Sequence, residues 1–203
     1  MDEFHTKIRK ALSTDAEDFA ALIVMSAPSL FPAIYGDGVE GIMQHLFCQR
    51  SNLFSFEHVY FAELGGRKAG MVLGYDWQIK SGESWQTGSL LLGQMKGALL
   101  TKVRLLMKLE NVIGAVKDRE YYISNIAVYP EHRAAGIGTM LMFAVEEEAK
   151  KSGAERVALD VEVEDTGASR LYKRLGYSIA DESTVRLRRG RSFSFYRMCK
   201  ELK

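Results

Sequence analysis

Hydrophobic and polar residues alternate with two different periods along this chain, and each change of period marks a strand or a helix. Residues 6–12 alternate loosely as a first strand. The apolar run 19–25 predicts a helix with Thr14 as its N-cap, because Glu17 stands three positions later as in a capping box. A second helix is predicted over residues 39–49, whose apolar side chains recur at helical spacing.

The next elements predict a sheet with helices on both faces. Segments 58–64 and 68–77 flank Gly65-Gly66-Arg67, which is typical of an antiparallel hairpin. Further on, a strand, a helix and a strand are predicted at 121–129, 138–152 and 156–163, which together form a βαβ unit. A short helix at 166–175, capped by Asp165, precedes two last strands at 177–187 and 192–201. The predicted fold class is a mixed α/β sheet.

Two segments fall outside this regular pattern. Residues 28–38 are rich in helix breakers and are predicted to form a connection. Residues 81–118 contain an apolar stripe that predicts an inserted amphipathic helix; the stripe consists of Leu99, Leu100, Val103, Leu106 and Met107. This helix could pack on its own core, cover a substrate mouth, touch an anionic surface or pair with a second subunit, so a homodimer is left open.

Length and composition favour one cytoplasmic domain over residues 1–203. Lys and Arg total 27 against 26 for Asp and Glu, so there is no basic excess that would argue for a nucleic-acid partner. The start of the chain lacks the features of a secretory signal, and charges break the most apolar region, so no membrane partner is expected. Cys48 and Cys199 are predicted to be reduced core thiols, and the sequence has no cluster at metal-ligand spacing.

The most informative chemistry lies in the turn Arg133-Ala134-Ala135-Gly136-Ile137-Gly138, between a predicted strand and a predicted helix. Two glycines let successive backbone N–H groups point outward at the positive end of the helix, which suits a phosphate. Arg133 could add a charge-assisted hydrogen bond. An ordinary strand-to-helix turn would use the same glycines without binding anything.

A second motif stands downstream, in the run Leu159-Asp160-Val161-Glu162-Val163-Glu164-Asp165 and the ending Leu171-Tyr172-Lys173-Arg174-Leu175-Gly176-Tyr177. Taken with the glycine turn, it closely resembles the GNAT superfamily of acetyl-CoA-dependent N-acetyltransferases over residues 121–177. The resemblance implies a mostly antiparallel sheet splayed around an acyl-CoA slot. It also implies direct transfer of an acetyl group from acetyl-CoA to a primary amine of a protein or a small molecule.

The resemblance also implies roles for individual residues. It places the coenzyme A pyrophosphate on Arg133, Ala134, Ala135, Gly136, Ile137, Gly138 and Thr139. A bulged strand carrying Ile126, Ala127 and Val128 would pair with the pantetheine arm. Tyr172 matches the tyrosine that protonates the departing thiolate. Asp165 stands where the family usually has asparagine, so it can cap its helix but cannot donate an amide hydrogen bond to the cofactor.

A general base is needed because a protonated amine cannot attack a thioester. Asp160, Glu162 and Glu164 alternate with valines, so a regular strand would place the three carboxylates on one face. Such a cluster attracts cations and raises the pKa of its members, although a solvated strand face would show the same pattern. Asp160 is the predicted base, because some family members have a glutamate at the matching position. Ser124 and Asn125 fall where other members place a glutamate base, and neither side chain is a good base.

Two other functions share part of this pattern. A non-catalytic module that senses acyl-CoA would keep the slot without a base. A P-loop nucleotide enzyme is excluded because no Gly-Lys-Ser/Thr follows the glycine turn. The acceptor amine stays open among protein N-termini, lysines, polyamines and aminoglycosides.

Overall fold

A seven-stranded mixed sheet runs through the computed structural model, which describes residues 6–94, 113–186 and 192–202. The strands are β1 (Thr6–Lys10), β2 (Val59–Leu64), β3 (Arg67–Asp76), β4 (Glu120–Val128), β5 (Arg156–Glu162), β6 (Ser178–Arg186) and β7 (Ser192–Glu201). Their order is β1-β2-β3-β4-β5-β7-β6, and only the pair β4 and β5 is parallel. The predicted mixed, mostly antiparallel sheet is therefore confirmed.

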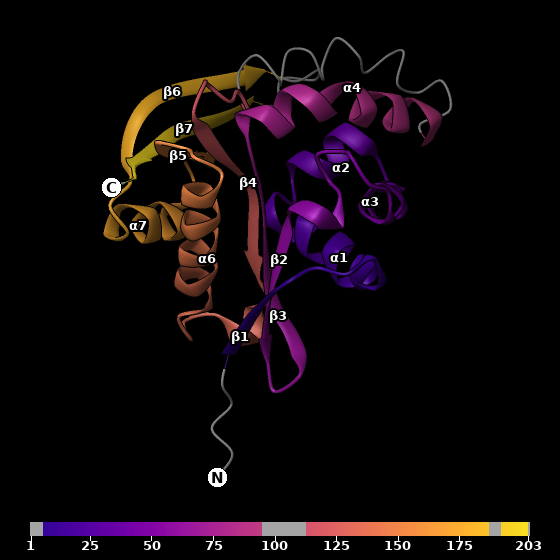
Figure 1. The fold of residues 1–203 in the computed structure, drawn as a ribbon, viewed down its shortest axis with the longest axis horizontal. Coiled ribbons are helices and arrows are strands. Elements are labelled where there is room, and N and C mark those ends of the chain that lie inside the picture. Colours follow the sequence, from indigo (N-terminus) through magenta and orange to yellow (C-terminus); the bar gives the residue numbers. More distant parts are fainter. Residues whose placement is uncertain (1–5, 95–112, 187–191, 203) are drawn as a thin grey trace.

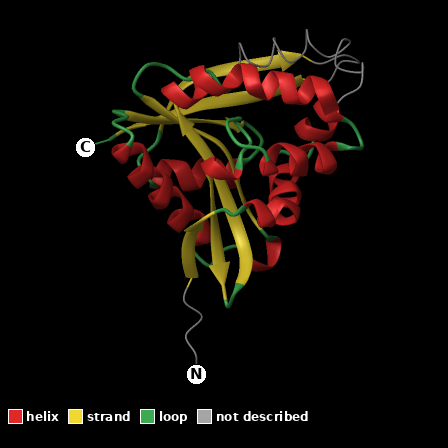
Figure 2. Ribbon diagram, turned by 45° about the vertical axis from the view of Figure 1, so that its right-hand side comes forward, coloured by secondary structure: helices red, strands yellow, loops and turns green. Residues whose placement is uncertain are grey.

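Helices cover both faces of this sheet (Figures 1 and 2). One group comprises α1 (Ala16–Ser26), α2 (Leu30–Tyr35) and α3 (Val39–Cys48), and the other comprises α6 (Ile137–Lys151) and α7 (Thr166–Arg174). The long helix α4 (Trp77–Gln94) runs across the top of Figure 1, above the first group. Short 3-10 turns occupy Ser13–Asp15, Phe56–His58 and Pro130–His132.

The central strands are buried on both faces because each face packs against its own helices. Val72 of β3 belongs to the cluster that α6 fills with Leu141 and Val145. Its neighbours Met71 and Leu73 belong to the opposite cluster, beneath α1 and α3. In that cluster the rings of Phe19 and Phe47 stack with centroids 4.3 Å apart. Burial of these large apolar side chains is the main favourable contribution to folding.

The sheet divides at the junction of β4 and β5. The two strands pair only from Glu120 to Ile123, opposite Arg156 to Leu159, and then separate. A register shift on the other side of β4 leaves Ser124 as an extra residue, which is a β-bulge. Opposite the bulge, a Cβ added to Gly74 would lie 2.7 Å from Cε1 of Tyr121, so only glycine fits there. The bulge bends β4 away from β5 and opens the sheet.

Every predicted strand is present, with ends that differ by at most two residues, but the start of the first helix was predicted wrongly. Residues Ser13–Asp15 form a 3-10 turn and α1 begins at Ala16, so Thr14 is not its N-cap. The Asp15 carboxylate instead accepts a hydrogen bond from the Leu12 N–H, with a donor to acceptor distance of 2.8 Å. Arg9 holds the same carboxylate from the neighbouring strand.

Three further expectations need correction. Residues 28–38 contain the helix α2, because Pro32 lies in its first turn, where proline is tolerated. The helical insertion begins at Trp77 rather than within 81–118, since Asp76 Oδ1 accepts hydrogen bonds from the N–H groups of Gln78 and Ile79. The apolar stripe at 99–107 lies outside the described residues. Both cysteines are reduced, but Cys48 is exposed and Cys199 is only partly buried.

Candidate active site

The glycine turn between β4 and α6 forms a concave arrangement of backbone amides. Ala134 and Gly136 both have positive φ, at 63° and 79°, and Gly136 is the N-cap of α6. In the described structure, the turn bonds include none donated by the N–H groups of Ala134, Ala135 and Gly136. The first N–H groups of α6 lack intrahelical partners by helix geometry. Unpaired amides at the positive end of a helix form an anion site, so this turn suits a phosphate group.

A cavity of about 500 Å³ lies over this turn. Its lining includes Arg133, Ala134, Gly136, Ile137, Gly138 and Thr139, together with residues of β4 and α7. Gly138 is the point where α6 approaches α7, because a Cβ added there would lie 3.3 Å from Leu171 Cδ2. The Arg133 Nε donates to the Val128 backbone oxygen at 3.2 Å, which holds the arginine beside the cavity. Its terminal nitrogens can still reach a phosphate.

The diverging edge of β4 forms the second wall of this cavity. Ile126, Ala127 and Val128 line it, and their strand has no β5 partner beyond Ile123. An extended ligand could therefore pair with this backbone as an additional strand does. The bulge that opens the slot lies at Ser124, two residues before the predicted position.

Helix α7 forms the third wall and positions Tyr172 deep in the slot. The Asp165 side chain accepts a hydrogen bond from the Ala168 N–H at 2.9 Å, so the predicted N-cap is confirmed. The side chain of Tyr172 is buried, and its hydroxyl has no hydrogen-bond partner among the described residues. Burial and the nearby negative charge of Asp165 raise the pKa of Tyr172, so its phenol stays protonated at neutral pH.

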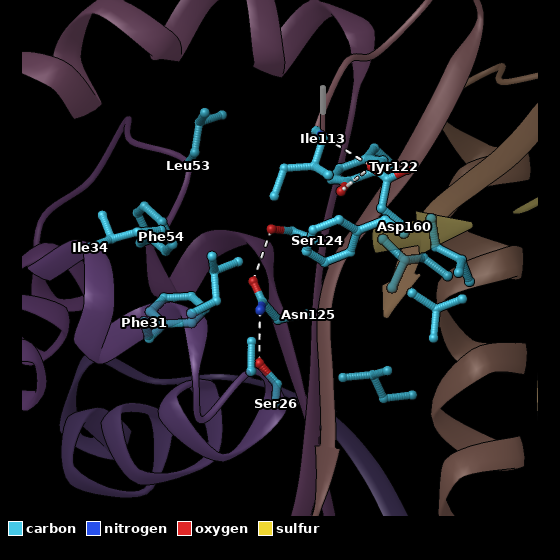
Figure 3. Close-up of a pocket in the computed structure, with 18 of the residues that line it drawn as sticks. Ser26, Phe31, Ile34, Leu53, Phe54, Ile113, Tyr122, Ser124, Asn125 and Asp160 are labelled. Carbon is cyan, nitrogen blue, oxygen red and sulfur yellow. Dashed lines mark hydrogen bonds between the residues drawn. The ribbon is translucent and has the colours of Figure 1, made fainter. Parts of the chain in front are cut away.

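A second cavity, of about 600 Å³, is also lined by Tyr172. Figure 3 shows part of its lining, including Phe31, Leu53 and Asp160. The two cavities share six lining residues: Met25, Ser26, Ile126, Asp165, Ala168 and Tyr172. The second cavity extends from these residues between the sheet and the helices α1, α2 and α4. The slot and the second cavity thus form one continuous site with Tyr172 at the junction.

Three polar side chains form a hydrogen-bonded chain near this junction, visible at the centre of Figure 3. The Asn125 amide nitrogen donates to Ser26 Oγ at 2.8 Å, and its amide oxygen accepts from Ser124 Oγ at 2.9 Å. Ser26 Oγ in turn donates to the backbone oxygen of Ile23. Both functional groups of Asn125 are occupied, so this residue fixes the end of α1 against the bulged strand.

The three carboxylates predicted to share one strand face have three different environments. Asp160 Oδ2 accepts hydrogen bonds from the Gly114 N–H, the Tyr122 hydroxyl and Arg197 Nη1, at 2.8, 2.9 and 3.0 Å. Glu162 lines the second cavity and, in the part of the chain that is described, has no ion-pair partner. Glu164 is exposed and follows the end of β5, so it is not on the strand.

The environment of Glu162 favours uptake of a proton. Burial raises the pKa of its carboxyl above the usual value, and the negative charges of Glu164 and Asp165 raise it further. A carboxylate with a raised pKa is a stronger base. By contrast, Asp160 Oδ2 already accepts three hydrogen bonds, one of them from the cation Arg197.

Comparison with protein families gives a match over most of the chain. Residues 29–177 match the model of the Acetyltransferase (GNAT) family, which is more than half of the 203 residues. The chain belongs to the GNAT family.

Curated GNAT relatives match a part of the chain. The Uncharacterized N-acetyltransferase YobR of Bacillus subtilis (strain 168) is 42% identical over 79 residues, which is 38% of this chain and 32% of that protein. N-alpha-acetyltransferase 30 of Schizosaccharomyces pombe is 38% identical over 56 residues, 28% of this chain and 37% of that protein. The chain therefore spans about a third of the length of the curated relatives that it matches.

Solved structures show the GNAT fold over nearly the whole chain. An N-acetyltransferase from Staphylococcus aureus Mu50 superimposes with a TM-score of 0.73 at 20% identity, covering 96% of this chain and all of that one. A putative acetyltransferase, yncA, from Salmonella typhimurium, solved with acetyl-CoA, gives a TM-score of 0.64 at 17% identity, covering 98% and 94%. At these identities the likeness concerns the fold alone.

The structure brings the predicted GNAT cofactor residues together around the slot. All of them line the cavity of the slot except Ala135, which lies in the turn itself. The predicted base, Asp160, lines the second cavity. Sequence reasoning missed Met25 and Ser26, which line both cavities at the end of α1. Nothing local marks these two residues, since only the fold brings α1 against β4.

None of the described helices is long and apolar enough to cross a membrane.

Proposed function

We propose that this protein transfers an acetyl group from acetyl-CoA to a primary amine by direct attack of the amine nitrogen. The observation that carries the proposal is the meeting of two cavities at Tyr172, one over a phosphate-type turn and one bordered by a carboxylate with a raised pKa. An acyl donor and an acceptor could enter from opposite sides and meet there. Family membership supports acetyl-CoA as the donor.

Each wall of the slot has a defined task in this proposal. The amides of the glycine turn bind the pyrophosphate, and the open edge of β4 holds the extended arm. The thioester supplies an electrophilic carbonyl carbon and a thiolate leaving group. The amine nitrogen forms the new C–N bond as the C–S bond breaks, so no residue of the chain needs to carry the acetyl group.

Two protons must move for this exchange to balance. Glu162 accepts the proton that the attacking amine loses, and Tyr172 donates a proton to the leaving thiolate. Coenzyme A leaves as the thiol, and the proton taken up by Glu162 returns through solvent to the Tyr172 phenolate, so one N–H bond is broken and one S–H bond is formed. Both residues line the cavity on the acceptor side, and Tyr172 also lines the slot.

Glu162 replaces the predicted Asp160 as our proposed base because the contacts of the two carboxylates differ. Asp160 is joined to Arg197 and Tyr122 in a buried network, and it serves there as a positioning residue. Glu162 borders the same cavity without such partners in the described structure. The two assignments make opposite predictions for activity and for stability.

The test begins with calorimetric titration of the full chain with acetyl-CoA, followed by thiol release in the presence of a panel of primary amines. Glu162→Gln should lower kcat by roughly 10²-fold or more, the usual contribution of a general base, with little change in stability. Glu164→Gln is the matched control: Glu164 is exposed and only its charge acts on Glu162, so this change should lower kcat far less than Glu162→Gln does. Asp160→Asn should lower stability more than Glu162→Gln does, and kcat less.

Three results would contradict the proposal. Failure to bind acetyl-CoA would remove the slot assignment. Binding with no turnover of any amine would favour the non-catalytic sensor. A larger loss of kcat in Asp160→Asn than in Glu162→Gln would return the base to Asp160. Tyr172→Phe should also lower kcat about 10²-fold while acetyl-CoA still binds, because only the hydroxyl is lost.

A further inference from the structure

The acceptor cavity has a charged end and an apolar end. Its charged end is lined by Tyr172 and by two carboxylates. Glu162 is the last residue of β5, and Asp165 is the N-cap of α7. Its apolar end is formed by α2, α4 and the loop before β2. The apolar side chains there are Leu30, Phe31, Ile34, Leu53, Phe54 and Leu91. In Figure 3, Phe31, Ile34, Leu53 and Phe54 lie opposite Tyr122 and Asp160 across the cavity.

This apolar end is built from side chains that are packed in place. Leu30, Phe31, Ile34, Leu53 and Leu91 are each 6–7% exposed, so they form a fixed surface rather than a flexible one. The rings of Phe31 and Tyr35, both on α2, lie 5.8 Å apart and form one aromatic surface on that helix. A cavity of about 600 Å³ is within the size range of sites for small organic ligands.

The carboxylates of this cavity are too few and too close together for a polycation. Asp160 is neutralised by Arg197, and Asp165 caps α7. Glu162 is therefore the carboxylate best placed to attract an ammonium group. A second ammonium group further along the ligand would lie against Phe31, Ile34 and Leu53, where burying a charge without a partner is costly.

We propose that the acceptor is a small primary monoamine with a bulky aromatic or branched apolar body, of the phenethylamine type. This inference rests on the proposed function and specifies its substrate class. The amine nitrogen lies at the charged end, near Tyr172, and the apolar body fills the space between α2 and α4. Polyamines and aminoglycosides fit this division of the cavity poorly, because their charges are spread along the molecule.

Helix α4 offers a way to test the cavity without disturbing its core. Lys80, Ser84, Thr87, Gly88 and Leu91 line the cavity at helical spacing. The helix is anchored by the His58 ring, 2.8 Å from the Glu83 carboxylate, and by Thr87 Oγ1, which accepts from the Leu53 N–H at 2.9 Å. It therefore forms a fixed wall.

Gly88 and Gly82 form a matched pair on this wall. A Cβ added to either glycine meets no atom within 4 Å, so each position accepts a larger side chain. Gly88 lines the cavity, whereas Gly82 is exposed and does not. Leucine is a better helix former than glycine, so both substitutions keep α4 folded. Gly88→Leu reduces the space for the apolar body of the ligand, and Gly82→Leu leaves that space unchanged.

The experiment measures kcat/KM with acetyl-CoA for phenethylamine, ethylamine and spermidine. We expect phenethylamine to exceed ethylamine by at least about tenfold, since one methylene in an apolar pocket already contributes a factor of 10 or more. Gly88→Leu should lower the ratio of phenethylamine to ethylamine by about tenfold. Gly82→Leu should keep the wild-type ratio.

The outcomes separate this inference from the proposed function. Turnover that favours spermidine, or a ratio unchanged by Gly88→Leu, overturns the inference and leaves the acetyltransferase proposal intact. If acetyl-CoA binds but no amine is acetylated, the proposed function fails. Calorimetric binding of phenethylamine to the coenzyme A complex then decides the inference. Binding that Gly88→Leu weakens and Gly82→Leu does not supports the apolar site, and absence of binding refutes it.

Discussion

Replacing Arg197 by methionine should lower the free energy of unfolding of this protein, because the arginine neutralises two buried carboxylates. Its side chain is 14% exposed, and it contacts Glu120, which is 1% exposed, and Asp160, which is 4% exposed. The guanidinium also lies 5.1 Å from the centre of the Tyr122 ring. Methionine retains much of the apolar stem but leaves both carboxylates without this cation.

The size of the effect follows from the partners that remain. Breaking a buried ion pair from one side costs about 3–5 kcal/mol, because an uncompensated charge stays buried. Here Glu120 keeps its contact with Arg156 at 3.0 Å, and Asp160 keeps the Tyr122 hydroxyl. We therefore expect the lower end, about 3 kcal/mol, which corresponds to a fall in Tm of roughly 6–12 °C for a domain of this size.

Urea denaturation followed by circular dichroism measures this free energy of unfolding. Arg119→Met is the control, since Arg119 pairs with Glu155 on the surface and its loss should change stability little. Adding Asp160→Asn to Arg197→Met should recover part of the loss, because it removes the buried charge that is left without a cation. A loss below about 1 kcal/mol for Arg197→Met would refute the argument, since an uncompensated buried charge costs more than that.

Two further predictions concern the first turn and the glycine turn. Burial alone would raise the pKa of Asp15, but hydrogen bonds from Arg9 and the Leu12 N–H outweigh it and lower this pKa to about 2, below the usual 3.8. Because the folded pKa is depressed, the stabilisation is complete above pH 4 and is lost as the pH falls toward 2. Asp15→Asn should therefore lower the free energy of unfolding at pH 7 by about 2 kcal/mol and make it depend less on pH in acid. If the free energy of unfolding falls equally steeply with decreasing pH in both proteins, this prediction is wrong. Gly136→Ala should cost about 1–2 kcal/mol, because its φ of 79° is unfavourable for alanine although space is open, and it should weaken acetyl-CoA binding measured by calorimetry. Gly153→Ala is the control, because Gly153 has a φ of 80° and equally open space at the other end of α6. It should show the same loss of stability with unchanged acetyl-CoA binding. If both variants lose acetyl-CoA binding equally, the turn is not the pyrophosphate site.

The sequence could predict the elements whose signals are local. The glycine turn, the cap at Asp165 and the hairpin at Gly65-Gly66 each depend on neighbouring residues, and the structure places each of these elements as predicted. Helix α2 has no clear signal in the sequence, because Pro32 is typical of a helix break, although the first turn of a helix needs no N–H donor at that position.

The candidate site was harder to predict because its contacts join distant parts of the chain. Asp160 and Glu162 have similar chemistry, and what distinguishes them is the set of contacts that Asp160 makes with residues 37 to 46 positions away, namely Gly114, Tyr122 and Arg197. Ser26 comes within hydrogen-bonding distance of Asn125 across 99 residues. Such pairings follow from the sheet order, which no periodicity in the sequence reveals.

The single extra residue in β4 also sets which side chains serve the two faces of the sheet. Before the bulge, Tyr121 and Ile123 point to the α6 face; after it, Ile126 and Val128 do, so the alternation changes phase at Ser124. Ala127 consequently packs beneath α1 on the opposite face. Removing one residue at this point would restore regular alternation and exchange the side chains of the following segment between the two faces. The length of this strand, counted in single residues, is thus as much a part of the site as any functional group that the strand carries.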